Sequence, residues 1–210
     1  LTITIKTLME EKGCSAGALE CWSLFPKELG IAPCMVISAL GDMGIPLSCE
    51  MDLNGALTMA MAKAAALNEE AVFLADLTIR HPENDNAELL WHCGPFPSVL
   101  CNKTQKPKII NAQGSWELQK GNITILRCDE TGGKYQMIAA EGKAVDGPET
   151  TGTYVWVEFD NWKRLEEKFI FGPYIHHVAG VYGNYKRALK EAAGYLGIEW
   201  DDITIGPESL

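Results

Sequence analysis

The sequence predicts an α+β protein, and three observations lead to that class. Up to about residue 77, strand-like and helix-like runs alternate, as in an α/β domain. Short strand-like runs separated by Gly, Asn and Lys turns follow, a spacing typical of an antiparallel barrel or sandwich. The pattern then returns to helix, and a hydrophobic content of 47% suits a globular chain with a substantial core.

The first part begins with a helix-like run, residues 1–13, that stops at Gly13. The strands expected after it are residues 16–22, 45–50 and 71–77. The helices expected between them are residues 32–44 and residues 53–67. Strand, helix and strand in this order form a crossover unit, which would bring the last two strands parallel.

The second part opens with a polar segment, residues 79–88, that is expected to be a loop. The strand-like runs after it are residues 88–93, 108–112, 115–119, 122–129, 134–142 and 153–159. Helices are expected at residues 161–169 and within residues 182–197.

The net charge indicates which binding partners are excluded, and the cysteine content indicates the cell compartment. Eighteen basic against twenty-eight acidic residues give a net charge of −10, which would repel nucleic acid and anionic membranes. The seven cysteines include no C-x-x-C pair, which favours reduced thiols, mostly in the core, over a disulfide framework. Without a secretory signal or a long apolar run, the protein is expected to be cytoplasmic.

The chain begins at Leu1, inside a helical pattern rather than at a methionine. We therefore expect a fragment of a longer protein, from which upstream domains are absent.

Acidic side chains end two of the predicted strands. A parallel crossover would place Glu50 and Asp76 at one carboxyl edge, where open α/β sheets bind ligands. Two facing carboxylates repel each other unless a cation lies between them, which suggests a metal site. Alternatively, the negative charge of Glu50 could be stabilised by the positive N-terminus of the nearby helix. For Asp52 the favoured interpretation is the N-cap of the following helix, a role that Asn54 could also fill.

Four histidines are the other candidate ligands. His81 lies in the polar segment and is expected to be solvated. His92 ends a strand-like run, where a histidine is as often a hydrogen-bonded core residue as a ligand. His176 and His177 are neighbours in an extended run, so only one of them is expected to face a shared site.

Two carboxylates and one imidazole indicate which ion would bind. They suit Mn²⁺, with Mg²⁺ or Co²⁺ as alternatives, better than Zn²⁺, which prefers more nitrogen and sulfur. These ligands lie far apart in the sequence, and no H-E-x-x-H, P-loop or G-x-G-x-x-G motif accompanies them.

Three stretches, "CEMDLNGALTMA", "FLADLTIRHPENDNAELLWHCGPFP" and "HHVAGVYG", together resemble the C-terminal part of the L-fucose isomerase and L-arabinose isomerase superfamily, in particular its fucose-isomerase-like members. The resemblance covers about residues 14–185 and lies in the order and spacing of acid, acid and histidine. It implies that Glu50, Asp76 and His177 bind the metal. His92 matches a further histidine of arabinose isomerases. His92 or His176 would be a fourth metal ligand or would contact the ligands from outside.

The resemblance also implies the architecture. Residues 1–68 would be the C-terminal portion of an α/β, Rossmann-like domain, and residues 69–210 a mainly antiparallel β-barrel domain with C-terminal helices. The full-length parent would be a homo-oligomer whose upstream region, partly from a neighbouring subunit, helps to cover the substrate.

The activity that the resemblance implies is that of a sugar ketol-isomerase, which interconverts an aldose and a ketose through a metal-stabilised enediolate. Glu50 and Asp76 would be both ligands and acid/base groups, one moving a proton from C2 to C1 and the other a proton between O1 and O2. Glu20 and Trp22 are candidate substrate contacts, if the strand before them joins the same sheet. The sequence leaves open which sugar binds and which carboxylate is the C2 base, and activity is expected of the parent rather than of the fragment.

Two other classes of function stay open. The chain could be a carbohydrate-binding or oligomerisation module that keeps the scaffold without catalysis. Failure of Glu50, Asp76 and His177 to converge would favour that interpretation. His92, His177 and Asp76 could instead form a two-histidine, one-carboxylate iron site.

Overall fold

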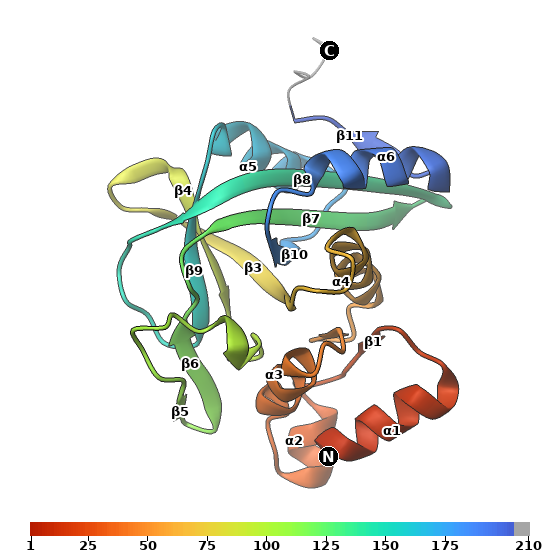
Figure 1. Cartoon of the computed structure of the whole chain (residues 1–210), viewed down its shortest axis with the longest axis vertical. Coiled ribbons are helices and arrows are strands. Elements are labelled where there is room, and N and C mark those ends of the chain that lie inside the picture. Colours follow the sequence, from red (N-terminus) through yellow and green to blue (C-terminus); the bar gives the residue numbers. More distant parts are fainter. Residues whose placement is uncertain (204–210) are drawn as a thin grey trace.

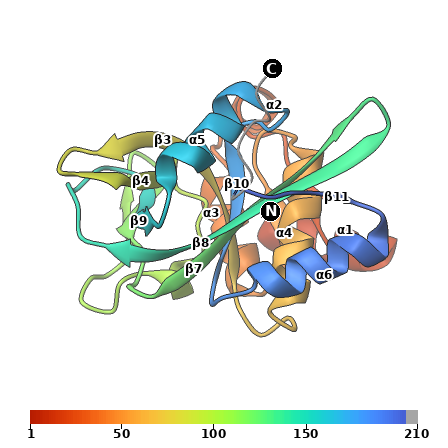
Figure 2. The same cartoon turned by 90° about the horizontal axis from the view of Figure 1, so that it is seen from above.

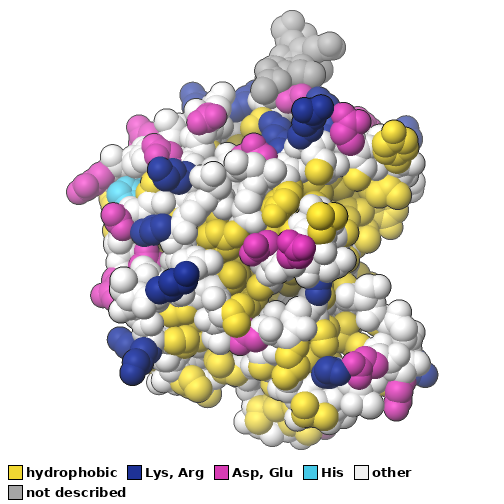
Figure 3. All heavy atoms as spheres, viewed as in Figure 1, with side chains coloured by type: hydrophobic (Ala, Val, Ile, Leu, Met, Phe, Trp, Pro, Cys, Tyr) yellow, Lys and Arg dark blue, Asp and Glu magenta, His cyan; other side chains and the backbone are white. Residues whose placement is uncertain are grey.

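The computed structural model describes residues 1–203 and shows a large β-sheet with helices around it, joined to a smaller, mostly helical N-terminal part (Figure 1). The α+β class predicted from the sequence is confirmed. The surface is indented at one side between these two parts (Figure 3). Among the described residues, no helix combines the length and the apolar character needed to cross a membrane.

The N-terminal part has a small core of its own. Helix α1 (Thr2–Lys12) ends as predicted at Gly13, whose φ of 64° permits the left-handed turn that closes the helix. Two short strands, β1 (Gly17–Ala18) and β2 (Leu47–Ser48), pair in parallel, and α2 (Leu24–Leu29) and α3 (Cys34–Asp42) lie between them in the sequence. The hydrophobic cluster at the centre of this part consists of Met9, Cys21, Ile37, Leu40, Leu47 and Cys49.

Nine strands form the large sheet. They are β3 (Val72–His81), β4 (Asn84–His92), β5 (Lys108–Ile110), β6 (Gln113–Glu117), β7 (Asn122–Thr131), β8 (Lys134–Val145), β9 (Thr153–Phe159), β10 (His177–Tyr182) and β11 (Glu199–Asp201). Their order is β11-β8-β7-β10-β3-β4-β9-β6-β5. Because β8 also pairs with β9, the strands β8, β7, β10, β3, β4 and β9 are joined in a ring. A single 3-10 turn, η1 (Ser98–Leu100), precedes β5.

Apolar side chains pack on both faces of this sheet. The main core lies on one face and includes α5 (Trp162–Phe171), and its largest side chains are Phe73, Phe96, Trp116 and Trp162. On the opposite face, β3, β7, β8 and β10 pack against α4 (Leu53–Ala65) and α6 (Lys186–Leu196) (Figure 2). Helix α4 therefore connects the N-terminal part to the sheet.

The sheet is mixed rather than mainly antiparallel as predicted. β11 pairs in parallel with β8, and β6 pairs in parallel with β9. The first pairing arises because α6 carries the chain back along the sheet before β11 begins. The second arises because the β7–β8 hairpin separates β6 from β9 in the sequence and lets β9 run in the direction of β6.

Two local predictions are also wrong. β2 and β3 are not a parallel pair, because β2 pairs with β1 while β3 runs antiparallel to both β4 and β10. The polar segment 79–88 is not a loop but the ends of β3 and β4, joined by a tight turn at Pro82 and Glu83. Polar residues suit this hairpin because most of its tip is exposed to solvent.

Glu88 is an acid inside the sheet. Its side chain on β4 is 3% exposed, and one of its carboxylate oxygens has no hydrogen-bond partner among the described residues. Burial raises the pKa of Glu88 to about 8, and the charge of Glu166 adds to the shift while Arg80 opposes it. Because the unfolded chain releases this proton near its ordinary pKa, the folded state loses stability as the pH rises from about 4.5 to about 8.

Glu88→Gln is therefore expected to remove a loss of stability that the wild type shows in this pH window. Urea unfolding between pH 5 and pH 8 should give a wild-type free energy of unfolding that falls, relative to the variant, by up to about 1.4 kcal/mol per pH unit. Glu158→Gln, at an exposed position of the neighbouring strand β9, is the control and should run parallel to the wild type. Parallel curves for Glu88→Gln and the wild type would contradict the prediction.

Candidate functional site

Strand register places an acid opposite a histidine at one end of the sheet. In the antiparallel pair of β3 and β10, Asp76 lies directly opposite His177. β4 lies on the other side of β3, with Trp91 opposite Asp76 and His92 next along the strand. Side chains from three neighbouring strands thus meet where β10 begins and β4 ends.

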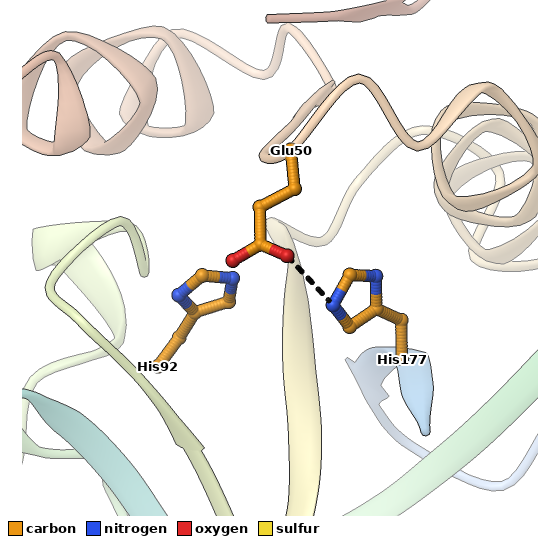
Figure 4. A group of neighbouring side chains, drawn as sticks. All are labelled: Glu50, His92 and His177. Atoms are coloured by element: carbon orange, nitrogen blue, oxygen red, sulfur yellow. Dashed lines mark ion pairs between the residues drawn. The ribbon is translucent and has the colours of Figure 1, made fainter. Parts of the chain in front are cut away.

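A strained turn brings Glu50 to the same point. Glu50 and Met51 have φ values of 59° and 56°, which are uncommon for residues with a side chain. Such backbone conformations cost on the order of 1–3 kcal/mol each and collect at functional sites. The turn connects β2 to α4, and the Glu50 carboxylate extends from it towards the ends of the sheet strands (Figure 4). The indole N–H of Trp22 donates to Oε1 of Glu50 over 2.6 Å and orients the carboxylate.

The ring of His177 is the centre of this group. Its Nε2 atom lies 3.2 Å from Oδ1 of Asp76 and 3.5 Å from Oε2 of Glu50. His92 points to the same place from β4, and its ring centroid lies 6.2 Å from that of His177 (Figure 4). The side chains are 5% exposed for His177, 15% for Asp76 and 29% for Glu50, so the group opens to solvent on the Glu50 side.

A buried ion-pair network lies behind His177. Nδ1 of His177 is 2.9 Å from Oδ2 of Asp52, which is also the N-cap of α4, as predicted. Arg127, whose side chain is 1% exposed, donates hydrogen bonds to both carboxylate oxygens of Asp52 and to both of Asp129. Asp129 in turn accepts the backbone N–H of Ile175, two residues before His177. The network therefore joins α4, β7 and the segment that leads into β10.

This network decides which nitrogen of His177 faces the acids. An ionised carboxylate can only accept, so Nδ1 of His177 carries a proton and donates it to Asp52. Nε2 is left to face Glu50 and Asp76. Burial alone would lower the pKa of His177, but the carboxylates of Asp52 and Asp76 outweigh burial and raise it to about 9. Positive charge is therefore favoured at Nε2, as expected where a cation binds.

Both buried aspartates that contact His177 are held ionised. Burial acts to raise the pKa of each, but the contact with His177 and further positive charge reverse the direction. For Asp52 that charge comes from Arg127, and for Asp76 from His177 itself, so the pKa values of Asp52 and Asp76 are both lowered. An acid kept ionised at neutral pH is suited to holding a cation rather than to donating a proton.

His92 has the opposite tautomer. The backbone N–H of Cys93 donates to Nδ1 of His92 over 2.9 Å, so the neutral ring carries its proton on Nε2. Burial lowers the pKa of His92 and keeps the ring neutral, although the charges of Asp76 and Glu50 act the other way. A metal-binding Nε2 would have to be unprotonated. His92 is therefore arranged as a hydrogen-bond donor into the site.

The remaining predicted residues lie around this group. His176 is exposed, yet its Nε2 lies 3.6 Å from Oδ1 of Asp76. Both neighbouring histidines thus reach one acid, contrary to expectation, because β10 begins at His177 and strand alternation does not extend to His176. Glu20 accepts hydrogen bonds from the backbone and hydroxyl of Ser23, at the start of α2, instead of turning to the other acids. Trp22 is 68% exposed and lies against Glu50.

The donor set fits a hard divalent cation. Three buried atoms lie at this point, Oδ1 of Asp76 and Nε2 of His92 and of His177. Among the described residues Nε2 of His92 has no hydrogen-bond partner, and the 3.2 Å contact between Asp76 and His177 lacks hydrogen-bond geometry. Unpaired buried polar atoms are costly, and their convergence indicates a ligand. Candidate ligand atoms within 4.8 Å of one another form two groups, Glu50 with His92 and His177, and Asp76 with His176 and His177. His177 is common to both, and carboxylate oxygen with imidazole nitrogen suits Mn²⁺, Mg²⁺ or Co²⁺.

Two roles in this site were not predicted. The sequence marked Asp52 only as a helix cap and did not single out Arg127. The available signal was a charged residue inside the apolar run "NITILRCD", because a buried guanidinium needs a partner. One partner, Asp129, lies two positions further in the same run, but the other, Asp52, lies 75 positions away, so the sequence pattern could not name it.

Asp52→Asn is expected to destabilise the fold, because it leaves the buried charge of Arg127 with one carboxylate fewer. Removing one member of a buried ion pair costs on the order of 3–5 kcal/mol. Urea unfolding at pH 7 measures the change, with Glu50→Gln as the control. The control removes a partly exposed acid and should stay within about 1 kcal/mol of the wild type. Equal stability of Asp52→Asn and the control would show that Arg127 does not depend on Asp52.

Comparison with known proteins shows the family of this chain. Residues 90–204 match the family described as L-fucose isomerase, C-terminal domain. The chain is 30% identical over 204 residues to sulfoquinovose isomerases of Priestia aryabhattai and Priestia megaterium, which covers 93% of this chain and 45% of each relative. A sulfoquinovose isomerase of Clostridium sp. (strain MSTE9) is 25% identical over 202 residues, which covers 91% of this chain and 44% of that relative. The chain thus spans less than half the length of these relatives, and it belongs to the L-fucose isomerase C-terminal domain family.

Proposed function

We propose that this chain carries the catalytic site of a sugar isomerase that interconverts an aldose and a ketose. The observation that carries the proposal is the approach of two carboxylates, those of Glu50 and Asp76, to one atom, Nε2 of His177, from separate elements. Family membership supports it. Because the chain spans less than half the length of its relatives, we propose the activity for the complete protein.

Glu50, Asp76 and His177 would hold a divalent ion, which we propose to be Mn²⁺. Glu50 and Asp76 supply hard oxygen ligands. Because Asp52 keeps a proton on Nδ1 of His177, Nε2 is the nitrogen that would bind the ion, in exchange for the proton that the raised pKa favours there. A bound ion would supply positive charge beside two adjacent oxygens of the sugar while a proton moves between their carbons.

Glu50 is the better placed acid for moving the carbon-bound proton. Its carboxylate is 29% exposed and lies on the open side of the group, whereas Asp76 is 15% exposed and is surrounded by imidazoles. We assign to Glu50 the removal of the C2 proton and its delivery to C1. Asp76, held ionised by its lowered pKa, is assigned to the proton that moves between O1 and O2, along with its role as a ligand.

His92 is assigned to substrate binding. Its Nε2–H is buried, points into the site and would find its partner in a sugar oxygen. Exposed Trp22 offers a flat face beside Glu50 against which a sugar ring could lie. The relatives are named sulfoquinovose isomerases, so sulfoquinovose is the first aldose to test, before L-fucose and L-arabinose.

The two other functions are less well supported. A binding module without catalysis does not require candidate ligand atoms from several elements to lie close together. Here those of Glu50, His92 and His177 lie within 4.8 Å of one another, as do those of Asp76, His176 and His177. A two-histidine, one-carboxylate iron site would need His92 as a ligand through an unprotonated Nε2, and the hydrogen bond from Cys93 favours the other tautomer.

Replacing either acid by its amide should remove most of the isomerase activity. In the complete protein with Mn²⁺, Glu50→Gln and Asp76→Asn are each expected to lower kcat by about 100-fold or more, the usual contribution of a general acid or base. The assay is formation of ketose from the three aldoses, followed by chromatography. Glu83→Gln, at the exposed tip of the β3–β4 hairpin, is the control and should match the wild type. Full activity in both amide variants would refute the assignment.

A further inference from the structure

Two cysteines that the proposed function does not use lie in contact beside the site. Cys34 is the first residue of α3, and Cys93 directly follows β4. Their sulfur atoms are 3.5 Å apart, although 59 positions separate the two residues in the sequence. Cys34 is 3% exposed and Cys93 is partly exposed, so an oxidant can reach the pair from the Cys93 side. Within the described chain all seven cysteines are free thiols.

Cys93 also determines the state of His92. Its backbone N–H donates to Nδ1 of His92 over 2.9 Å, and its sulfur atom lies 3.3 Å from the same nitrogen. These two contacts hold the ring with its proton on Nε2, directed into the site. Any movement of Cys93 towards α3 therefore changes the hydrogen bonding of His92.

We propose that Cys34 and Cys93 form a reversible disulfide when the protein meets a peroxide, and that this bond withdraws His92 from the site. The thiolate of Cys34 attacks one peroxide oxygen, which breaks the O–O bond, releases hydroxide and leaves a sulfenic acid. The sulfur of Cys93 then attacks the Cys34 sulfur, forms the S–S bond and expels water. In sum, the two thiols lose two electrons and two protons, and one hydrogen peroxide becomes two waters.

The geometry makes the second step short. A disulfide requires the two sulfur atoms to approach to about 2.0 Å, which is a movement of about 1.5 Å from the contact seen here. Cys34 begins a helix, where the positive end of the helix dipole favours a thiolate, the form that attacks. In a reducing cytosol such a bond would be transient, as is usual for sensing disulfides.

The disulfide would affect His92 because it links Cys93 to a different part of the molecule. Cys34 belongs to the N-terminal part, and Cys93 belongs to the sheet that carries His92. A covalent bond between them would shift the sulfur atoms by about 1.5 Å in total, and Cys93 Sγ is itself 3.3 Å from Nδ1 of His92, so we propose that the shift loosens this contact. The role of His92 in catalysis rests on the proposed function, whereas formation of the bond does not.

Peptide mapping tests the bond itself. The complete protein in a Cys14→Ser background, which removes the exposed thiol, is treated with hydrogen peroxide, alkylated and digested with trypsin without reduction. Cleavage after Lys27, Lys63, Arg80 and Lys103 should yield residues 28–63 joined to residues 81–103. Each peptide contains a second cysteine, Cys49 in the first and Cys101 in the second, so serine variants make the assignment.

The cross-link should disappear in Cys34→Ser and in Cys93→Ser and persist in Cys101→Ser, a buried cysteine without a cysteine partner. Cys34→Ala replaces the serine variant if a hydroxyl at this buried position prevents folding. A cross-link that survives in the Cys34 and Cys93 variants, or none in the Cys101 variant and the background protein, would overturn the proposal.

Nitrogen-15 NMR of labelled histidine tests the coupling without relying on catalysis. Peroxide should shift both imidazole resonances of His92, identified with His92→Gln, and dithiothreitol should reverse the shift. His81, on the far end of β3, should not respond. A cross-linked protein with unchanged His92 resonances would overturn the coupling. If the complete protein isomerises sugars, turnover should fall at least tenfold with the cross-link, and if it does not, the mapping and NMR results still decide this proposal.

Discussion

The candidate site depends on one buried ion pair, between Arg127 and Asp52. A guanidinium that is 1% exposed is tolerated only if carboxylates surround it, since an unpaired charge in the core costs several kcal/mol. Asp52 brings the N-terminus of α4 to β7, and Asp129 holds the backbone of Ile175. The same ion pair thus fixes the helix that follows Glu50 and the segment that precedes His177. The two parts of the molecule meet at a defined geometry because this charge must be neutralised.

The two buried histidines of the site, His92 and His177, differ in chemistry because they have different hydrogen-bond partners. Asp52 accepts a hydrogen bond from Nδ1–H of His177, so Nε2 faces the acids, whereas the backbone N–H of Cys93 donates to Nδ1 of His92 and leaves a proton on Nε2. One ring is thereby prepared to bind a cation and the other to donate a hydrogen bond. Neither outcome requires a special residue type, because ordinary neighbours select the tautomer. The strained turn at Glu50 then supplies the acid on the open side.

The α+β class was predictable from the sequence, and the structure brings the predicted site residues Glu50 and Asp76 to His177, although by another route. The two acids were expected at the edge of one parallel sheet, whereas Asp76 reaches His177 because β10 pairs with β3, and Glu50 reaches it from the turn after β2. Local periodicity could not reveal this, since strand pairing across 100 positions leaves no local pattern. The role of Arg127 was hidden for the same reason. Helix ends such as Gly13 and the Asp52 cap were predictable because their causes are local.

The central claim is that Nε2 of His177, with Glu50 and Asp76, forms a metal site and that His92 does not bind the ion. Anomalous diffraction at the manganese edge, from crystals grown with Mn²⁺, tests it most directly. The account predicts one peak within bonding distance, about 2.1–2.3 Å, of Glu50, Asp76 and Nε2 of His177, with Nδ1 of His177 still on Asp52. A peak bonded to His92 instead of Asp76, or Mn²⁺ bound only elsewhere on the protein, would contradict it.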